Sequence, residues 1–337
     1  MDTSPKIFEA GDLHLQCGVV LEDTKLAYQT YGTLNKSGNN AIVHPTWYGG
    51  RHSDVEWLIG PGRPLDTNRF FIVVPNLFGN GLSTSPSNMP KKRASEKFPR
   101  ISLYDNVVCQ HKLITEVLNV KHIRLVMGWS MAAMQTFQWG CLFPNLIDNL
   151  APSCGAARCS PHNSAMLDGL RAALTADSAF DGNLFKTSPT RGVQAMAKVY
   201  ASWGTGQAFF QEEAYKDIGF ASAEDYVVGF WENFLKSHHP NDLLSMIDTW
   251  NHGDISANPK FRNNFEGALK AISARTVVLS AKTDLYFPPE DSEYEVTHIP
   301  NSEIRLFHSN FGHLAAGWLN PTDVELHERT IRELLEL

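Results

Sequence analysis

Short apolar runs, separated by turn-forming and polar segments, mark much of the first 150 residues. Continuous apolar runs are typical of strands that are buried on both faces of a sheet. The expected strands are residues 13–20 and 26–31, which we expect to pair antiparallel, and residues 41–43, 70–74 and 123–127. Apolar positions at helical spacing predict helices over residues 105–118 and 132–143.

The alternation of strands and helices returns near the end of the chain. Residues 276–280 and 304–307 predict two further strands, and residues 322–337 predict a closing helix. Thr322 is the expected N-cap of this helix, with Glu325 as its capping-box partner. Strands that alternate with helices predict a mostly parallel central sheet with helices on both faces.

The strand pattern fades between residues 157 and 270. Helical periodicity instead marks residues 163–176, 191–203, 223–236 and 242–250. We therefore expect an α/β core formed by residues 1–156 and 271–337. Residues 157–270 are the expected helical lid insertion over the carboxyl edge of the sheet.

A candidate nucleophile lies between an expected strand and the helix that follows it. Gly128-Trp129-Ser130-Met131-Ala132 has the pattern G-x-S-x-A, one methyl group away from the common G-x-S-x-G. Small residues flank such a serine because the turn is tight and lifts the hydroxyl above the strand end. An ordinary strand–helix turn capped by Ser130 would have the same pattern. The strand before it and the helix after it favour a nucleophile.

A serine on such a turn needs a base and an acid, and these follow it along the chain as acid and then histidine. Asp284 and His313 come after the last two expected strands, so both loops lie at the same sheet edge as Ser130. His308 and Asp291 are the alternatives. His308 directly follows a strand, and Asp291 fits a helix N-terminus. We therefore predict Ser130 as nucleophile, Asp284 as orienting acid and His313 as base.

Backbone amides near the serine are expected to stabilise the negative charge of an acyl-transfer intermediate. The N–H groups of Thr46 and Met131 are the predicted donors of this oxyanion hole, although the Gly49-Gly50 turn after Thr46 also fits simple packing. Trp47, Tyr48 and Leu314 are the predicted pocket residues. Further aromatic residues that fit either the pocket or the core are Trp203, Phe209, Phe210, Trp231 and Trp250.

Composition narrows the class of protein. The 337 residues carry a formal net charge of -7, which argues against a nucleic-acid binder. Five scattered cysteines without CxxC spacing favour a reducing compartment, and neither a signal peptide nor a membrane-length apolar run is evident. We therefore expect a cytoplasmic protein. No metal-binding motif such as HExxH is present, so neither a metal nor another cofactor is expected.

Several segments together resemble the homoserine O-acetyltransferase family of α/β-hydrolases. They lie in the same order as in the family and span nearly the whole chain. The matching residues are 47–50, 59–62, 65–67, 76–83, 98–99, Asp105, 128–135, 284–288 and 312–313. The resemblance implies an α/β-hydrolase fold with a helical lid and a ping-pong mechanism through an acyl-serine. By analogy it also favours a homodimer.

The chain departs from this family at positions that would meet the acceptor. Ala132 and Ala133 replace two glycines of the family, and Leu314 stands where homoserine enzymes carry Asp. Residues 192–198 lack the Arg that holds the acceptor's carboxylate. Because a buried charge without a partner costs several kcal/mol, homoserine should bind poorly. The site is better suited to a less polar acceptor or to water.

Three functions are consistent with these residues. Hydrolysis of a short-chain carboxylic ester, such as an acetyl ester, is the favoured one. The second is an O-acetyltransferase that moves acetyl from acetyl-CoA to an alcohol other than homoserine; both would use the same acyl-enzyme and a small-molecule ester or alcohol as partner. The third, a non-catalytic protein of the hydrolase fold, is disfavoured by the complete set of Ser130, Asp284 and His313.

Overall fold

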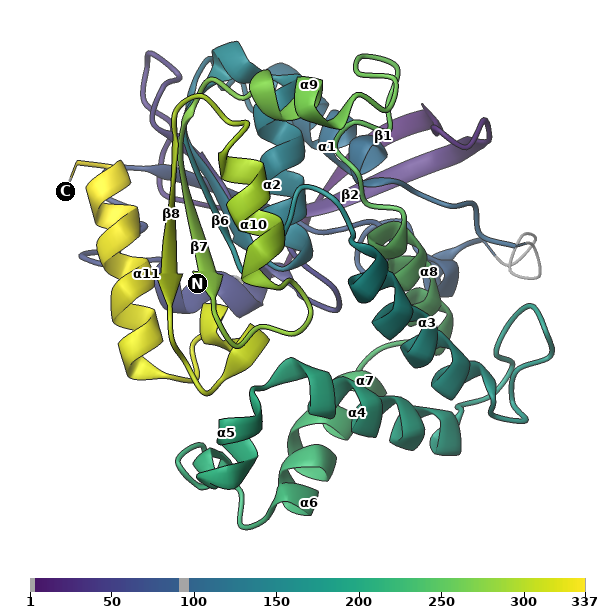
Figure 1. Ribbon diagram of the computed structural model, residues 1–337. Coiled ribbons are helices and arrows are strands. Elements are labelled where there is room, and N and C mark those ends of the chain that lie inside the picture. Colours follow the sequence, from purple (N-terminus) through teal and green to yellow (C-terminus); the bar gives the residue numbers. More distant parts are fainter. Residues whose placement is uncertain (1–3, 91–96, 337) are drawn as a thin grey trace.

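The computed structural model describes residues 4–90 and 97–336, and it is organised around one eight-stranded sheet (Figure 1). The spatial order is β1-β2-β4-β3-β5-β6-β7-β8. The strands are β1 (Lys6–His14), β2 (Val20–Tyr31), β3 (Ala41–Val43), β4 (Phe71–Pro75), β5 (Ile123–Trp129), β6 (Ile147–Ser153), β7 (Arg275–Ala281) and β8 (Ser302–Phe307). Only the β1–β2 and β2–β4 pairs are antiparallel, which confirms the expected mostly parallel sheet.

The first two strands pair as predicted but with different bounds. Residues 15–19 form the turn instead of extending the first strand, and Gly18 adopts a φ of +84° that favours glycine. The sequence pattern also missed β6. Asp148, Asn149 and Pro152 interrupt its apolar run, although β6 lies between β5 and β7 in the middle of the sheet.

Helices cover both faces of the sheet. One face carries α1 (Leu103–Lys112, continued by a π-helical turn, Leu113–Val117), α2 (Met131–Leu142), α9 (Phe265–Lys270) and α10 (Pro289–Val296). The other face carries the short helix His52–Leu58 and α11 (Pro321–Leu334). A separate hydrophobic cluster fills the core on each side.

The predicted start of the last helix was wrong. Asn320, not Thr322, is the N-cap of α11, and its side chain accepts a hydrogen bond from the Thr322 N–H at 3.0 Å. Pro321 takes the first helical position because its fixed φ suits that place and its missing N–H needs no partner there.

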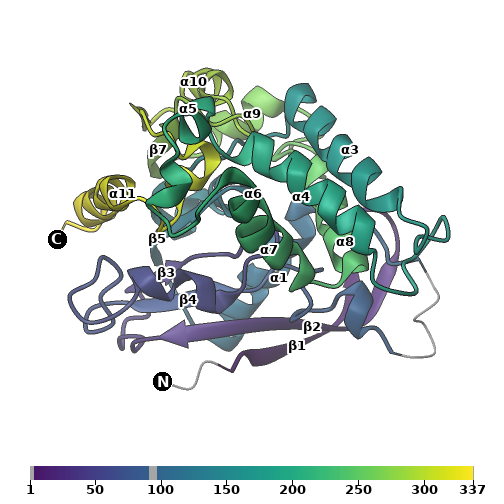
Figure 2. The same cartoon turned by 90° about the horizontal axis from the view of Figure 1, so that it is seen from below.

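Six helices gather near the carboxyl edge of the sheet, with α4 to α7 below it in Figure 1 and α3 and α8 to its right; Figure 2 shows them on the same side of the molecule. They are α3 (Pro161–Thr175), α4 (Thr190–Gly204), α5 (Gln207–Gln211), α6 (Ala223–Tyr226), α7 (Asn233–Lys236) and α8 (Pro240–Asn251). A π-helical segment, Val227–Glu232, joins α6 to α7. By contrast α9, which ends at Lys270, packs with α2 against the sheet. The division at residues 157 and 270 stays a prediction.

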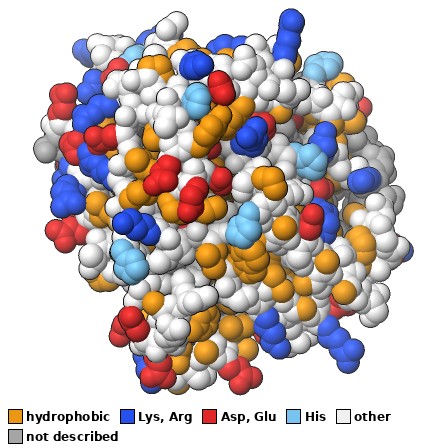
Figure 3. Space-filling view, viewed as in Figure 1, with side chains coloured by type: hydrophobic (Ala, Val, Ile, Leu, Met, Phe, Trp, Pro, Cys, Tyr) orange, Lys and Arg blue, Asp and Glu red, His pale blue; other side chains and the backbone are white. Residues whose placement is uncertain are grey.

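The surface of the face seen in Figure 1 carries acidic and basic side chains interspersed with apolar ones (Figure 3). No broad region of a single charge covers this face. Within the described part of the chain, every helix is too short or too polar to cross a bilayer.

His44, directly after β3, is expected to make stability depend on pH. It is 2% exposed, and burial lowers its pKa from 6.5 to about 4. Between these two values the unfolded chain binds a proton that the folded chain does not, so stability falls as the pH drops through this window. The loss is at most roughly 3 kcal/mol.

Chemical denaturation of wild type and His44→Asn between pH 7 and pH 4 checks this. The wild type should lose more unfolding free energy than the variant over that range. His308 is exposed, so His308→Asn should behave as wild type. Equal losses in wild type and His44→Asn would contradict the assignment.

Candidate active site

Ser130 occupies a strained turn between β5 and α2. Its φ of 58° and ψ of −130° lie in a region that residues other than glycine rarely adopt, at a cost on the order of 1–3 kcal/mol. The Ser130 N–H donates to the carbonyls of Ser153 (3.1 Å) and Cys154 (3.2 Å) at the end of β6. The neighbouring strand therefore holds the turn in place, as a nucleophile elbow requires.

Two glycines explain why this elbow tolerates alanine where the family has glycine. A Cβ on Gly128 would lie 2.5 Å from the Ala132 methyl group, and a Cβ on Gly155 would lie 2.5 Å from the Ala133 methyl group. The methyl groups of Ala132 and Ala133 thus fill space that Gly128 and Gly155 leave open. Close packing at the elbow is kept because Gly128 and Gly155, which face these methyl groups, have no side chain.

His313 and Asp284 form a buried pair on the loops that follow β8 and β7. The Nδ1–H of His313 donates to Oδ2 of Asp284 at 2.9 Å. The other oxygen, Oδ1, accepts the backbone N–H groups of Tyr286 (2.8 Å) and Phe287 (3.1 Å). His313 is 3% and Asp284 2% exposed. The two amides fix the carboxylate, and the carboxylate fixes the tautomer of the imidazole.

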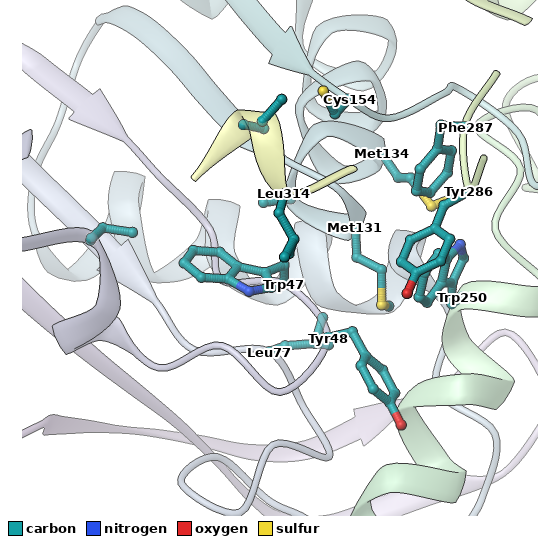
Figure 4. Packing of buried hydrophobic residues seen from close by; sticks show 14 of the residues in the cluster. Trp47, Tyr48, Leu77, Met131, Met134, Cys154, Trp250, Tyr286, Phe287 and Leu314 are labelled. Carbon is teal, nitrogen blue, oxygen red and sulfur yellow. The ribbon is translucent and has the colours of Figure 1, made fainter. Parts of the chain in front are cut away.

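Aromatic rings surround the imidazole of His313. Their centroids lie 4.5 Å (Tyr286), 5.4 Å (Trp129) and 5.6 Å (Phe287) from that of His313. Figure 4 shows Tyr286 and Phe287 together on one side of Met131, with Leu314 directly above Trp47 on the other. These contacts restrict rotation of the imidazole and keep bulk water away from it.

Ser130 and His313 line one pocket together with the three predicted pocket residues, Trp47, Tyr48 and Leu314. Asp284 lies behind His313, outside this lining. No hydrogen bond joins Ser130 Oγ to His313 among the contacts of the described residues. Such bonds often shorten only when substrate binds.

The sequence missed several residues of this pocket. Trp231 lines it, whereas the other aromatic candidates, Trp203, Phe209, Phe210 and Trp250, do not. Tyr200 of α4, Phe230 of the π-helical segment and Phe234 of α7 line it as well, and the segment after His313 contributes Trp318 and Leu319. Trp129 also lines it. Its position directly before Ser130 was the sequence feature that could have pointed to Trp129 as a pocket residue.

The alternative residues lie elsewhere. His308 is exposed at the end of β8. Asp291 lies in the first turn of α10 and lines a different pocket, together with Arg158. Cys154, next to the elbow, is a poor nucleophile because burial raises the pKa of its thiol well above the ordinary value.

One predicted oxyanion donor was wrong. The Thr46 N–H donates to the Pro75 carbonyl at 3.1 Å and so continues the β3–β4 hydrogen bonds instead of facing the elbow. The Trp47 N–H follows it and has no acceptor among the described residues. The Met131 N–H is the first amide of α2, where no intrahelical partner exists. Met131 stays a predicted oxyanion donor, and the Trp47 N–H becomes the second candidate in place of Thr46.

Residues 4–90 and 97–336 contain no group of three or more His, Cys, Asp or Glu side chains that could hold a metal ion. The chemistry available at this site is that of a serine, an imidazole, a carboxylate and two backbone amides. This set of groups is suited to acyl transfer.

Comparison with known proteins gives the class. Residues 42–318 match the α/β-hydrolase fold family, and the chain belongs to that family. It is 35% identical over 335 residues to ethyl acetate hydrolase of Pseudomonas veronii, covering 98% of this chain and 95% of that protein. It is 33% identical over 330 residues to a probable esterase of Corynebacterium glutamicum, covering 97% and 94%.

Solved structures also place this chain among α/β-hydrolases. The structure of the acetyl esterase MekB superposes with a TM-score of 0.94 at 34% identity, covering 99% of this chain and 97% of that one. The resemblance to homoserine O-acetyltransferases is confirmed as well. The enzyme of Chlorobaculum parvum is 28% identical over 312 residues, covering 89% of this chain and 86% of that protein.

Replacing Ser130 should separate backbone strain from chemistry. Ser130→Gly and Ser130→Ala both remove the hydroxyl, but glycine alone adopts the required backbone conformation without strain. We expect Ser130→Gly to have an unfolding free energy about 1 kcal/mol above that of Ser130→Ala, measured by chemical denaturation. Equal stabilities would mean that the elbow is not strained.

Adding a methyl group at Gly155 should damage the elbow. A Cβ there would lie 2.7 Å from the Ser130 carbonyl oxygen, so backbone must move. We expect Gly155→Ala to lower both stability and turnover. Gly169→Ala in α3 is the control, because its Cβ would meet nothing closer than 4.0 Å. That variant should be as stable as wild type or more stable, since alanine favours helix. A fully active Gly155→Ala would contradict the packing argument.

Proposed function

We propose that this protein is a serine esterase that hydrolyses short-chain carboxylic esters, such as acetyl esters, through an acyl-enzyme on Ser130. One observation carries the proposal: a serine on a strained elbow and a carboxylate-braced histidine line the same apolar pocket. The similarity to proteins named as an acetyl esterase and an ethyl acetate hydrolase supports it.

The geometry suits a two-step reaction. In the first step, Nε2 of His313 takes the proton of Ser130 Oγ while Oγ attacks the ester carbonyl. The amides of Met131 and Trp47 receive the negative charge on the carbonyl oxygen. The alcohol then leaves with the proton from His313. In the second step, His313 deprotonates a water molecule that attacks the acyl-serine, and the carboxylic acid leaves as Ser130 regains its proton.

The pocket favours uncharged substrates. Leu314 is 6% exposed and places a hydrocarbon side chain beside the base, at the position where homoserine enzymes carry Asp. Among residues 192–198, no arginine is available for a carboxylate. Because an ammonium or carboxylate group would lose its hydration here without a charged partner, an amino-acid acceptor is disfavoured. Water and small neutral alcohols meet no such penalty.

Acetyl transfer from acetyl-CoA to an alcohol other than homoserine is the second candidate. The similarity to homoserine O-acetyltransferases favours it, and the same acyl-serine would serve it. The two activities differ in which nucleophile reaches the acyl-serine. Hydrolysis is the favoured activity because this chain lacks the Asp and the Arg with which homoserine enzymes bind the acceptor.

Three further features belong to this proposal. Residues 157–270 form a lid on the core of residues 1–156 and 271–337. The side chains of Tyr200, Phe230, Trp231 and Phe234, which line the pocket, support this division.

The protein works in the cytoplasm, which is supported by its five cysteines, all of them free. It is a homodimer by analogy with the family.

Ester hydrolysis by purified protein tests the proposal directly. Wild type should hydrolyse p-nitrophenyl acetate, and Ser130→Ala or His313→Ala should each lower kcat by a factor on the order of 10³ or more. His308→Ala should act as wild type because that side chain is exposed at a strand end. If His308→Ala were inactive and His313→Ala active, the assignment of the base would be wrong.

Adding acetyl-CoA and candidate alcohols separates hydrolysis from transfer. The esterase is supported if alcohols do not change the rate of ester hydrolysis and acetyl-CoA is not consumed. Consumption of acetyl-CoA only when an alcohol is present would replace it by the transferase. Absence of both activities would overturn the proposal.

A further inference from the structure

Two indole rings separate the active-site pocket from a second cavity. Trp47 and Trp129 are the residues, within the described part of the chain, that line both spaces. Their ring centroids lie 4.9 Å apart. Gly50 leaves room for the first ring, since a Cβ there would lie 2.8 Å from the Trp47 indole. The His313 contact described above holds the second ring in place. We call these two rings, Trp47 and Trp129, the partition; neighbouring residues pack against it on both sides.

The second cavity has largely apolar walls. Val55, Leu58, Met127, Leu279 and Ile331 contribute to them. The cavity is small, about 20 Å³, so it can receive a hydrocarbon chain only if neighbouring space is opened to it.

Its histidines already have partners in the protein. The Nδ1–H of His327 donates to the Asp323 carbonyl and its Nε2 accepts from Ser153 Oγ, each at 2.7 Å. The Nδ1–H of His44 donates to the Pro45 carbonyl at 2.9 Å. Burial lowers the pKa of both imidazoles, so near neutral pH they bring no charge into the cavity.

The chemistry of the proposed esterase indicates which part of a substrate meets the partition. In the tetrahedral intermediate the carbonyl carbon is bonded to Ser130 Oγ, and the leaving oxygen must face Nε2 of His313. The negatively charged oxygen must face the amides of Met131 and Trp47. One bond remains, to the acyl chain. We assign this remaining direction to the rings of Trp47 and Trp129, which line the pocket together with Ser130.

We propose that Trp47 and Trp129 limit the acyl group of the ester to about the size of acetyl, and that the cavity behind them becomes part of the acyl site only when one of the indoles is removed. This inference rests on the proposed esterase function and extends it to acyl-chain length. Removing either indole should join the two spaces and let a longer hydrocarbon enter.

The test compares p-nitrophenyl acetate and butyrate with wild type, Trp129→Leu and Trp47→Leu. Burial of each added methylene is worth about 0.8 kcal/mol, or about 4-fold, so the butyrate-to-acetate ratio of kcat/KM should rise about 15-fold in each variant. The ratio cancels any general loss of activity from a disturbed site. Two variants guard against the misfolding of one.

Trp57→Leu is the matched control. Trp57 is a half-buried tryptophan that lines the second cavity but not the active-site pocket, so its removal enlarges the cavity and leaves the partition intact. Its butyrate-to-acetate ratio should equal that of wild type. A rise as large as in Trp129→Leu would overturn the partition.

Other outcomes would also overturn it. They are a wild type that hydrolyses butyrate as efficiently as acetate, or folded Trp129→Leu and Trp47→Leu proteins with unchanged ratios. If these variants instead gained activity only on acetates of longer alcohols, the assignment to the acyl chain would be wrong. A wild type that hydrolyses acetate in a Ser130-dependent way, combined with any of these results, would leave the proposed function standing and remove this inference alone.

Discussion

The backbone conformation of Ser130 is the constraint on which the site depends. A non-glycine residue at a φ of 58° would relax if its neighbours allowed it, and relaxation would turn Oγ away from the pocket. The carbonyls at the end of β6 and the immediate start of α2 prevent this. Gly128 and Gly155 provide the close approach that this packing needs. The end of β6, the start of α2 and these two glycines therefore hold one strained residue in place.

The remaining parts of the site follow from where parallel strands end. The loops after β7 and β8 reach the same edge as the elbow, so Asp284 and His313 meet there although 29 positions separate them along the chain. The rings of Trp129, Tyr286 and Phe287 then pack around His313. In such a water-poor space, hydrogen bonds to a developing charge are stronger than in water. The same dryness penalises charged substrates, which links the chemistry to the proposed preference for neutral esters.

How much of this the sequence predicts depends on the kind of signal. Fully buried strands such as β4 give continuous apolar runs, and the order Ser130, Asp284, His313 gives the candidate chemistry. β6 was missed because polar residues and a proline interrupt its run. Thr46 was wrong because the direction of its N–H depends on its pairing with β4, which spacing along the chain does not encode. Trp129 was missed since a packing side chain has no chemical pattern of its own.

Covalent labelling tests the central claim most directly. A fluorophosphonate reacts with a serine only when a neighbouring base activates it. Intact-mass spectra of the wild type should show one adduct, peptide mapping should place it on Ser130, and Asp284→Asn should label far more slowly. An unmodified wild-type protein, or an adduct on a different residue, would contradict the account.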